Sequence, residues 1–189
     1  MTRLSDIPVA PELIACARKG DEPARAQLYA ALAPGAFGLI RRLIGSRALA
    51  EDVFQETMMV FFERLGQFRG EAPLGAWLRQ IAVSRALMVL RSPWQRARRD
   101  IGLAGDEFDA APQSPGCPGE QLDLERALAS LTSTARAVVW LYEVEGYSHE
   151  EIAALFGRSV SFSKSQLARA HQRLRAWFQL QDLSPCTPS

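Results

Sequence analysis

The chain has 189 residues, of which 48% are hydrophobic and 23% charged, and its formal net charge at neutral pH is only +1. This composition is that of a folded protein with room for one ordinary domain or two small ones, and it excludes a polycation that coats nucleic acid by charge alone. No apolar run approaches the roughly 20 residues that span a bilayer, and no secretory leader pattern is visible. We therefore expect a cytoplasmic protein without membrane insertion.

The cysteines and histidines do not form a recognisable site. Cys16, Cys117 and Cys186 are odd in number and far apart, with no paired spacing that would indicate a disulfide framework or a zinc site. His149 and His171 have no nucleophile or metal-ligand partner at motif spacing. We therefore expect no metal, no cofactor, no catalytic residue and no enzymatic activity.

The first 66 residues predict helices and no strand. Pro11 and Pro23 stand near the starts of two short helices at 11–19 and 22–33, and Pro34-Gly35 separates these from a third at 36–44. A helix at about 48–66 has the clearest amphipathic pattern in the chain. The positions of its inner face, which step at three and four, are Ala50, Val53, Phe54, Thr57, Met58, Phe61, Phe62 and Leu65.

A second face of the helix at 48–66 is polar. Asp52, Gln55, Glu56 and Met59 follow the helical step, with Glu63 further along. One reading is a solvated face with acids near the positive end of the helix. The other is a docking surface for a basic partner.

A loop at 68–73, punctuated by Gly70 and Pro73, leads into a long apolar helix at 74–91. This helix should form the centre of the N-terminal domain, with Trp77 in its core. Its few polar positions are Arg79, Gln80, Ser84, Arg85 and Arg91. Phe68 and Arg69 could stack on an unpaired base and hold its phosphate, although Phe68 could equally anchor the loop on the core.

From residue 92 to 119 proline recurs among Gly, Ala, Asp and Ser, which is typical of a linker. Helices at 122–131 and 133–144 follow, the second with Val138, Val139, Trp140, Leu141 and Tyr142 as core and Gly146 as its end. The fold class is therefore all-α, with two small helical domains joined by a flexible linker. We place the domains at 1–91 and 120–181, the linker at 92–119 and a tail at 182–189.

Residues 148–177 predict a helix-turn-helix. Ser148 and Glu151 form a capping box, Gly157 ends the first helix with a left-handed backbone, and Ser161 can cap the second helix. Leu167, Ala170, Leu174 and Trp177 give the second helix one buried stripe.

The second helix of this motif is basic on its remaining faces. From Arg158 to Arg175 there are five Lys or Arg and no acid, which indicates a surface for a polyanion, although a solvated hairpin is the alternative. The first residues of such a helix reach base edges. The candidate base readers are Phe162, Ser163, Ser165 and Gln166, and the candidate phosphate contacts are Lys164, Arg169 and Arg173.

Two stretches together carry a family resemblance. They are AEDVFQETMMVFFERLGQFRGEAPLGAWLRQIAVSRAL and, after the proline-rich linker, LERALASLTSTARAVVWLYEVEGYSHEEIAALFGRSVSFSKSQLARAHQRLR. In this order they closely resemble the extracytoplasmic-function (ECF) sigma factors of bacterial RNA polymerase. The resemblance covers both helical domains and is more specific than a lone helix-turn-helix.

The resemblance implies a promoter-specificity subunit whose partners are core RNA polymerase, promoter DNA and an anti-sigma factor. Asp52, Gln55 and Glu56 would dock on the clamp helices of the largest polymerase subunit. The segment 68–91, including Phe68, Arg69, Gln80, Ser84 and Arg85, would recognise and open the −10 promoter element. The helix-turn-helix would read the −35 element as duplex.

The chain departs from the family pattern at a few positions. Ser84 replaces the usual Asn and Met88 the usual Asp in the promoter-opening helix, and VSFSKSQL replaces the common VGTVKSRL in the recognition helix. Phe162, Ser163 and Gln166 therefore indicate an altered promoter sequence. Two alternatives stay open: a sigma-like protein that only titrates an anti-sigma factor, and a stand-alone helix-turn-helix regulator.

Overall fold

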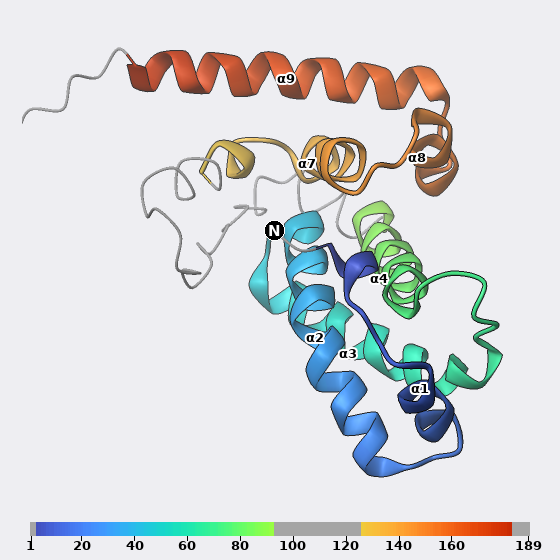
Figure 1. Ribbon diagram of the computed structural model, residues 1–189. Helices are drawn as coiled ribbons and strands as arrows, with labels where there is room; N and C mark the ends of the chain where they lie inside the picture. The colour runs from blue at the N-terminus through green and yellow to red at the C-terminus, as the bar shows by residue number, and fades with distance from the viewer. Residues whose placement is uncertain (1–2, 93–125, 183–189) are drawn as a thin grey trace, which may run out of the picture. The chain divides into compact units, whose positions relative to one another are not determined.

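The computed structural model describes residues 3–92 and 126–182 (Figure 1). The chain divides into two compact units, Met1–Arg96 and Ala97–Ser189, and each is described by itself. All regular secondary structure in the described ranges is helical, so the predicted all-α fold class is confirmed. The predicted linker and tail lie almost wholly outside the described residues.

The first unit is built on three long helices, α2 (Glu22–Ile44), α3 (Arg47–Arg64) and α4 (Leu74–Arg91), each of which packs on the other two (Figure 1). Three shorter elements complete it: η1 (Leu4–Asp6), α1 (Pro11–Arg18) and η2 (Leu65–Gln67). The core contains fully buried side chains from every long helix: Leu28, Leu32, Ile40, Leu43, Phe61, Leu78 and Leu87. The helix α4 has the bounds that the sequence predicts, 74–91.

The helix α2 is continuous, whereas the sequence predicts a break at Pro34. Proline inside a helix removes one hydrogen bond and costs about 3 kcal/mol. Pro34 and Ala30, whose carbonyl loses its donor, both lie on the exposed side of α2, where water can reach that carbonyl. Leu32 and Ala36 on the opposite side are buried against the rest of the unit. Since burying each leucine contributes about 2 kcal/mol, packing outweighs the local penalty.

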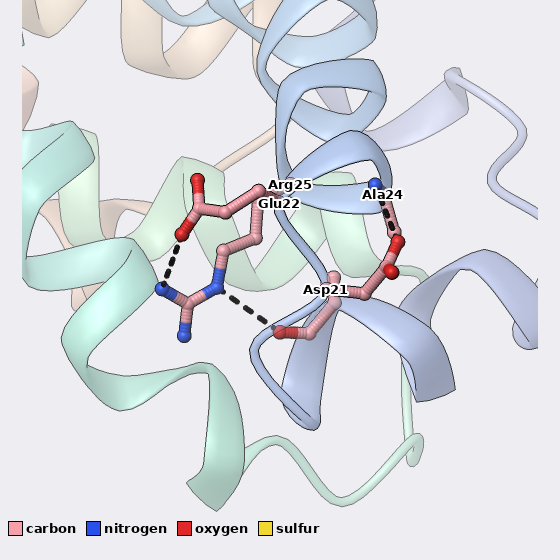
Figure 2. Close-up of polar contacts among 5 residues, drawn as sticks. Asp21, Glu22, Ala24 and Arg25 are labelled. Carbon is pink, nitrogen blue, oxygen red and sulfur yellow. Dashed lines mark hydrogen bonds and ion pairs between the residues drawn. The ribbon is translucent and has the colours of Figure 1, made fainter.

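The start of α2 is fixed by side chains on both sides of its first turn. The Asp21 carboxylate accepts a hydrogen bond from the Ala24 backbone N–H at 2.9 Å, which caps the helix (Figure 2). Arg25 donates from Nε to the Ala17 carbonyl at 3.2 Å and lies 3.8 Å from Glu22. The Arg25 bond fastens the end of α1 to α2.

The described residues of the second unit form a helical turn at 126–129, then α7 (Ser133–Val139), η3 (Trp140–Val144), α8 (His149–Phe156) and α9 (Val160–Asp182). Its buried apolar residues include Leu131, Val138, Leu141, Ile152 and Ala170. The first part of the helix predicted at 122–131 lies outside the described residues.

The predicted helix at 133–144 changes character after Val139. The Glu145 backbone N–H donates to the Trp140 carbonyl at 3.0 Å, five residues back, so η3 is a turn of wider π-helix. Trp140 also donates from its indole N–H to the buried Glu145 carboxylate at 3.3 Å. Gly146 then ends the helix with a φ of 75°, as predicted. Tyr142 differs from the core role predicted for it, because its side chain is 37% exposed.

Candidate functional site

The capping box at the start of α8 is present as predicted. The Glu151 N–H donates to the Ser148 hydroxyl at 3.2 Å, and the Ser148 N–H donates to the Glu151 carboxylate at 2.8 Å. Gly157 ends α8 with a left-handed φ of 60°. The next N–H, of Arg158, donates back to the Ala153 carbonyl at 2.9 Å, which closes the turn between the two helices.

The cap of α9 lies two residues earlier than the sequence predicts. Ser159, not Ser161, precedes the helix, and its hydroxyl accepts from the Phe162 N–H at 3.3 Å. Ser161 is already inside α9, where its carbonyl accepts from the Ser165 hydroxyl at 2.7 Å. Both serines suit a cap locally, and the short turn that follows Gly157 selects the first one. The recognition helix is therefore half a turn longer at its start.

The exposed side of α9 carries most of the predicted DNA contacts. Lys164, Ser165, Arg169 and Arg173 are all exposed, while Leu167 and Ala170 are buried against the unit. The Arg169 guanidinium donates back to the Ser165 carbonyl at 3.2 Å, which holds its side chain along the helix surface. Arg158 and Arg175 are also exposed and extend the basic surface at both ends.

Three predicted base readers are wholly or partly turned away from this surface. Ser163 is fully buried, and its hydroxyl lies 3.0 Å from Nδ1 of His149. It therefore lies inside the unit instead of on the exposed face that a base contact requires. Phe162 is half-buried, with its ring 5.7 Å from that of Phe156, and Gln166 is also half-buried.

Two histidines connect α9 to the preceding helices. His149 at the start of α8 bonds to Ser163 and stacks on Tyr142, with ring centroids 4.5 Å apart and planes 19° apart. His171 on α9 lies 3.0 Å from the Glu143 carboxylate of η3. Both are contacts between separate elements, and no local sequence pattern indicates them.

The carboxyl of Glu150, in the first turn of α8, has a lowered pKa. A hydrogen bond from its own backbone N–H and one from the Ser148 hydroxyl lower its pKa below the ordinary 4.5, with Lys164 and His149 adding attraction. Lys164 of the basic surface thus lies in the field of an acid from α8. Its attraction for a phosphate is weaker than that of an isolated lysine.

The polar face of α3 is fully accessible. Asp52, Gln55, Glu56 and Glu63 are exposed, and Met59 between them is 64% exposed. This face presents carboxylates around an exposed methionine, an arrangement that suits a partner with basic and apolar groups.

The exposed side of α4 is a stripe formed by Gln80, Ser84 and Met88, which follow each other at helical spacing. Met88 is 53% exposed. Arg85, next to this stripe, is largely covered and donates from Nη1 to the Glu56 carboxylate at 2.5 Å. Two residues predicted for different partners thus bind each other.

The sequence allows two roles for Phe68 in the loop before α4, and the structure supports only one of them. Phe68 is 8% exposed, and its ring lies 5.4 Å from that of Trp77, which also contacts Phe61. Phe68 is therefore the loop anchor, not an aromatic side chain that is free to stack on a base. Arg69 remains exposed, 3.9 Å from Glu71.

Within the described residues, no group of three or more acids, cysteines or histidines is placed to hold a metal ion. None of the described helices combines the length and the apolar character that crossing a membrane requires.

Comparison with protein families matches both units. Residues 28–96 match the Sigma-70 region 2 family and residues 121–174 the Sigma-70, region 4 family. The chain is 32% identical to the RNA polymerase sigma factor CarQ of Myxococcus xanthus, over 84% of this chain and 91% of CarQ. It is 30% identical to the ECF RNA polymerase sigma factor EcfG of Rhodopseudomonas palustris, over 71% of this chain and 74% of EcfG. The chain belongs to the ECF sigma factors of bacterial RNA polymerase.

An ECF sigma factor is a transcription regulator, and this one directs promoter-specific initiation by RNA polymerase. Two solved structures have a similar fold. One is RpoE of Bartonella quintana bound to the anti-sigma factor NepR, with a TM-score of 0.56, 24% identity and coverage of 82% of this chain and 96% of that one. The other is CnrH bound to the cytosolic domain of CnrY, with a TM-score of 0.51, 25% identity and coverage of 92% and 97%.

Proposed function

We propose that this sigma factor divides its work among three surfaces. The acidic face of α3, with Asp52, Gln55 and Glu56, docks on a basic surface of core polymerase. The exposed stripe of α4, with Gln80 and Ser84, acts with Arg69 and Arg85 on the −10 element. The basic surface of α9 reads the −35 element.

The observation that carries this proposal is the exposure of oppositely charged surfaces on separate helices. Asp52 and Glu56 are exposed on one face of α3, whereas Lys164, Arg169 and Arg173 are exposed on α9. Each cation placed on a phosphate releases condensed counterions, so the α9 surface attracts DNA. An acidic face repels DNA and favours a basic protein surface.

The burial of two predicted base readers supports a smaller set of base contacts on α9. We propose that Lys164, Arg169 and Arg173 contact phosphates and that Ser165 and Gln166 reach base edges. Phe162 offers only its half-buried ring edge, and Ser163 serves to hold α9 on α8 through His149. The −35 contacts would therefore be fewer and more polar than the sequence suggests.

The α4 surface that we propose for the −10 element carries two residues that depart from the family pattern. Ser84 and Met88, which depart from the family pattern, both lie on the accessible side of α4, so their side chains are available to DNA. We propose a changed −10 preference. The variant Ser84→Asn/Met88→Asp should fold normally and initiate from a different set of promoters; a set identical to that of the original chain would contradict this assignment.

An anti-sigma factor is proposed as the third partner, because both RpoE of Bartonella quintana and CnrH were solved with proteins that bind them. We also propose that the chain acts in the cytoplasm, on the polymerase, and that the polymerase supplies all the chemistry.

Core binding measured with Glu56→Gln tests the proposed polymerase surface on α3. A loss of affinity supports docking on α3, and unchanged affinity removes Glu56 from the interface.

A further inference from the structure

The N-terminal segment 3–18 lies outside the family match, which begins at residue 28. It nevertheless packs on the rest of the first unit, and two of its contacts lie on either side of the loop 68–73. One contact is made by η1 on the first turn of α4, and the other by α1 on η2.

The contact between η1 and α4 depends on the absence of a side chain at Gly75. A Cβ atom at this position would lie 2.0 Å from the Leu4 carbonyl oxygen and 3.5 Å from the Ser5 Cα. Real Cβ atoms do not approach backbone this closely, so the backbone of η1 rests directly on α4. Figure 1 shows η1 beside the start of α4.

Side chains of this segment also make a close contact with α2. A Cβ at Gly35 would lie 3.1 Å from Leu4 Cδ1 and 3.2 Å from Ile7 Cδ1. Leu4 itself is only 3% exposed. The segment is therefore wedged between α2 and α4.

The other end of the segment is bonded to η2, which directly precedes the loop. Arg18, the last residue of α1, donates from Nη2 to the Gly66 carbonyl at 2.9 Å. The bond from Arg25 to the Ala17 carbonyl keeps this end of α1 on α2. Arg18 thus joins η2 to the end of α1, which Arg25 in turn holds on α2.

We propose that residues 3–18 form an N-terminal brace that holds the two ends of the loop 68–73, at Gly66 and at Gly75, and so positions this loop for the −10 element. The inference rests on the proposed role of Arg69 and α4 in promoter opening. Fixing both ends of a loop lowers the entropy that it loses on binding, which raises affinity without a new contact to the ligand.

The brace is tested first without DNA, by thermal unfolding. Gly75→Ala should lower Tm by several degrees in the full chain, because its Cβ meets backbone. In a chain that begins at residue 8 the same change should not lower Tm, because the three nearest atoms to that Cβ all belong to Leu4 and Ser5. Gly66→Ala is the matched control, since a Cβ there meets nothing within 4 Å and should leave Tm nearly unchanged.

The role in promoter opening is tested with holoenzyme on a promoter that the original chain transcribes. Arg18→Met removes the bond to Gly66 from an exposed side chain, so it should not affect folding. We expect permanganate reactivity of the −10 thymines to fall by about two- to tenfold, the factor for one hydrogen bond, with core affinity unchanged. Trypsin should cleave faster after Arg69, and Arg18→Lys should restore much of the protection.

Several results would overturn the brace. They are equal effects of Gly75→Ala in the long and short chains, or normal trypsin protection and normal opening in Arg18→Met. If the shortened chain does not fold, Arg18→Met decides alone. Failure of the original chain to transcribe would instead count against the proposed function, while the unfolding and trypsin measurements would still report on the brace.

Discussion

Glu56 of α3 and Arg85 of α4 form an ion pair, with 2.5 Å between Oε1 and Nη1, although the first belongs to the proposed polymerase surface and the second to the proposed −10 surface. The Glu56 side chain is 53% exposed and that of Arg85 is 24% exposed. A half-exposed pair of this kind contributes about 0.2 to 1 kcal/mol to stability. A substitution at either residue therefore affects folding as well as function, and its test has to separate the two.

Glu56→Arg should abolish core binding and also lower stability, because it places two cations together. The double variant Glu56→Arg/Arg85→Glu should regain stability through the reversed pair but not core binding. Thermal unfolding and core affinity, measured on the same samples, distinguish these outcomes. Core binding by the double variant would show that the pair acts only in folding.

Lys164→Ala should weaken binding to every duplex sequence and reduce the slope of log affinity against log salt by about 0.9, as expected for one lost phosphate contact. Gln172→Ala is a suitable control, because Gln172 is exposed on the same helix and uncharged. Titration of a duplex containing the −35 element at several salt concentrations measures both. An unchanged slope for Lys164→Ala would remove it from the interface.

Gln166→Ala should cost roughly 1 to 3 kcal/mol at one base pair, provided that the half-buried amide reaches a base edge. Competition among duplexes that differ at single positions of the −35 element measures this loss. An equal loss on all duplexes would instead assign Gln166 to the packing of α9.

Ser163→Ala should destabilise the second unit by roughly 0.5 to 1.5 kcal/mol, because His149 loses its buried hydrogen-bond partner. Ser165→Ala, on the exposed side of α9, should have a smaller effect on unfolding. Base preference should survive Ser163→Ala. A specific loss at one base pair would show that Ser163 does reach DNA and that the buried position is not the one that binds.

Acid should weaken the second unit through Glu150. Its folded pKa is depressed below 4.5, chiefly by its own backbone N–H, so its stabilising contribution is complete above the unfolded pKa and is lost as pH falls through the folded pKa. Glu150→Gln should therefore flatten the decline in stability below about pH 4.5. The same decline in both chains would contradict the assignment.

Local patterns in the sequence predict much of this fold. The apolar spacing places α4 at its observed bounds, and the Ser148 and Glu151 pair predicts the start of α8, since both are properties of neighbouring residues. Pro34 misleads because the packing that keeps α2 intact comes from distant helices. Ser163 misleads in the same way, because its partner His149 lies 14 residues earlier and only the folded unit brings the two together. For Phe68 the sequence leaves two roles open, and the ring contact with Trp77 decides between them.

The most direct test of the account is run-off transcription with core RNA polymerase, this chain and a library of promoter fragments, scored against core enzyme alone. We predict selective initiation from a subset of fragments. We also predict loss of that initiation with Glu56→Arg/Arg85→Glu, which should retain the fold. Core binding without initiation from any fragment would contradict the account and favour a sigma-like protein that only titrates an anti-sigma factor.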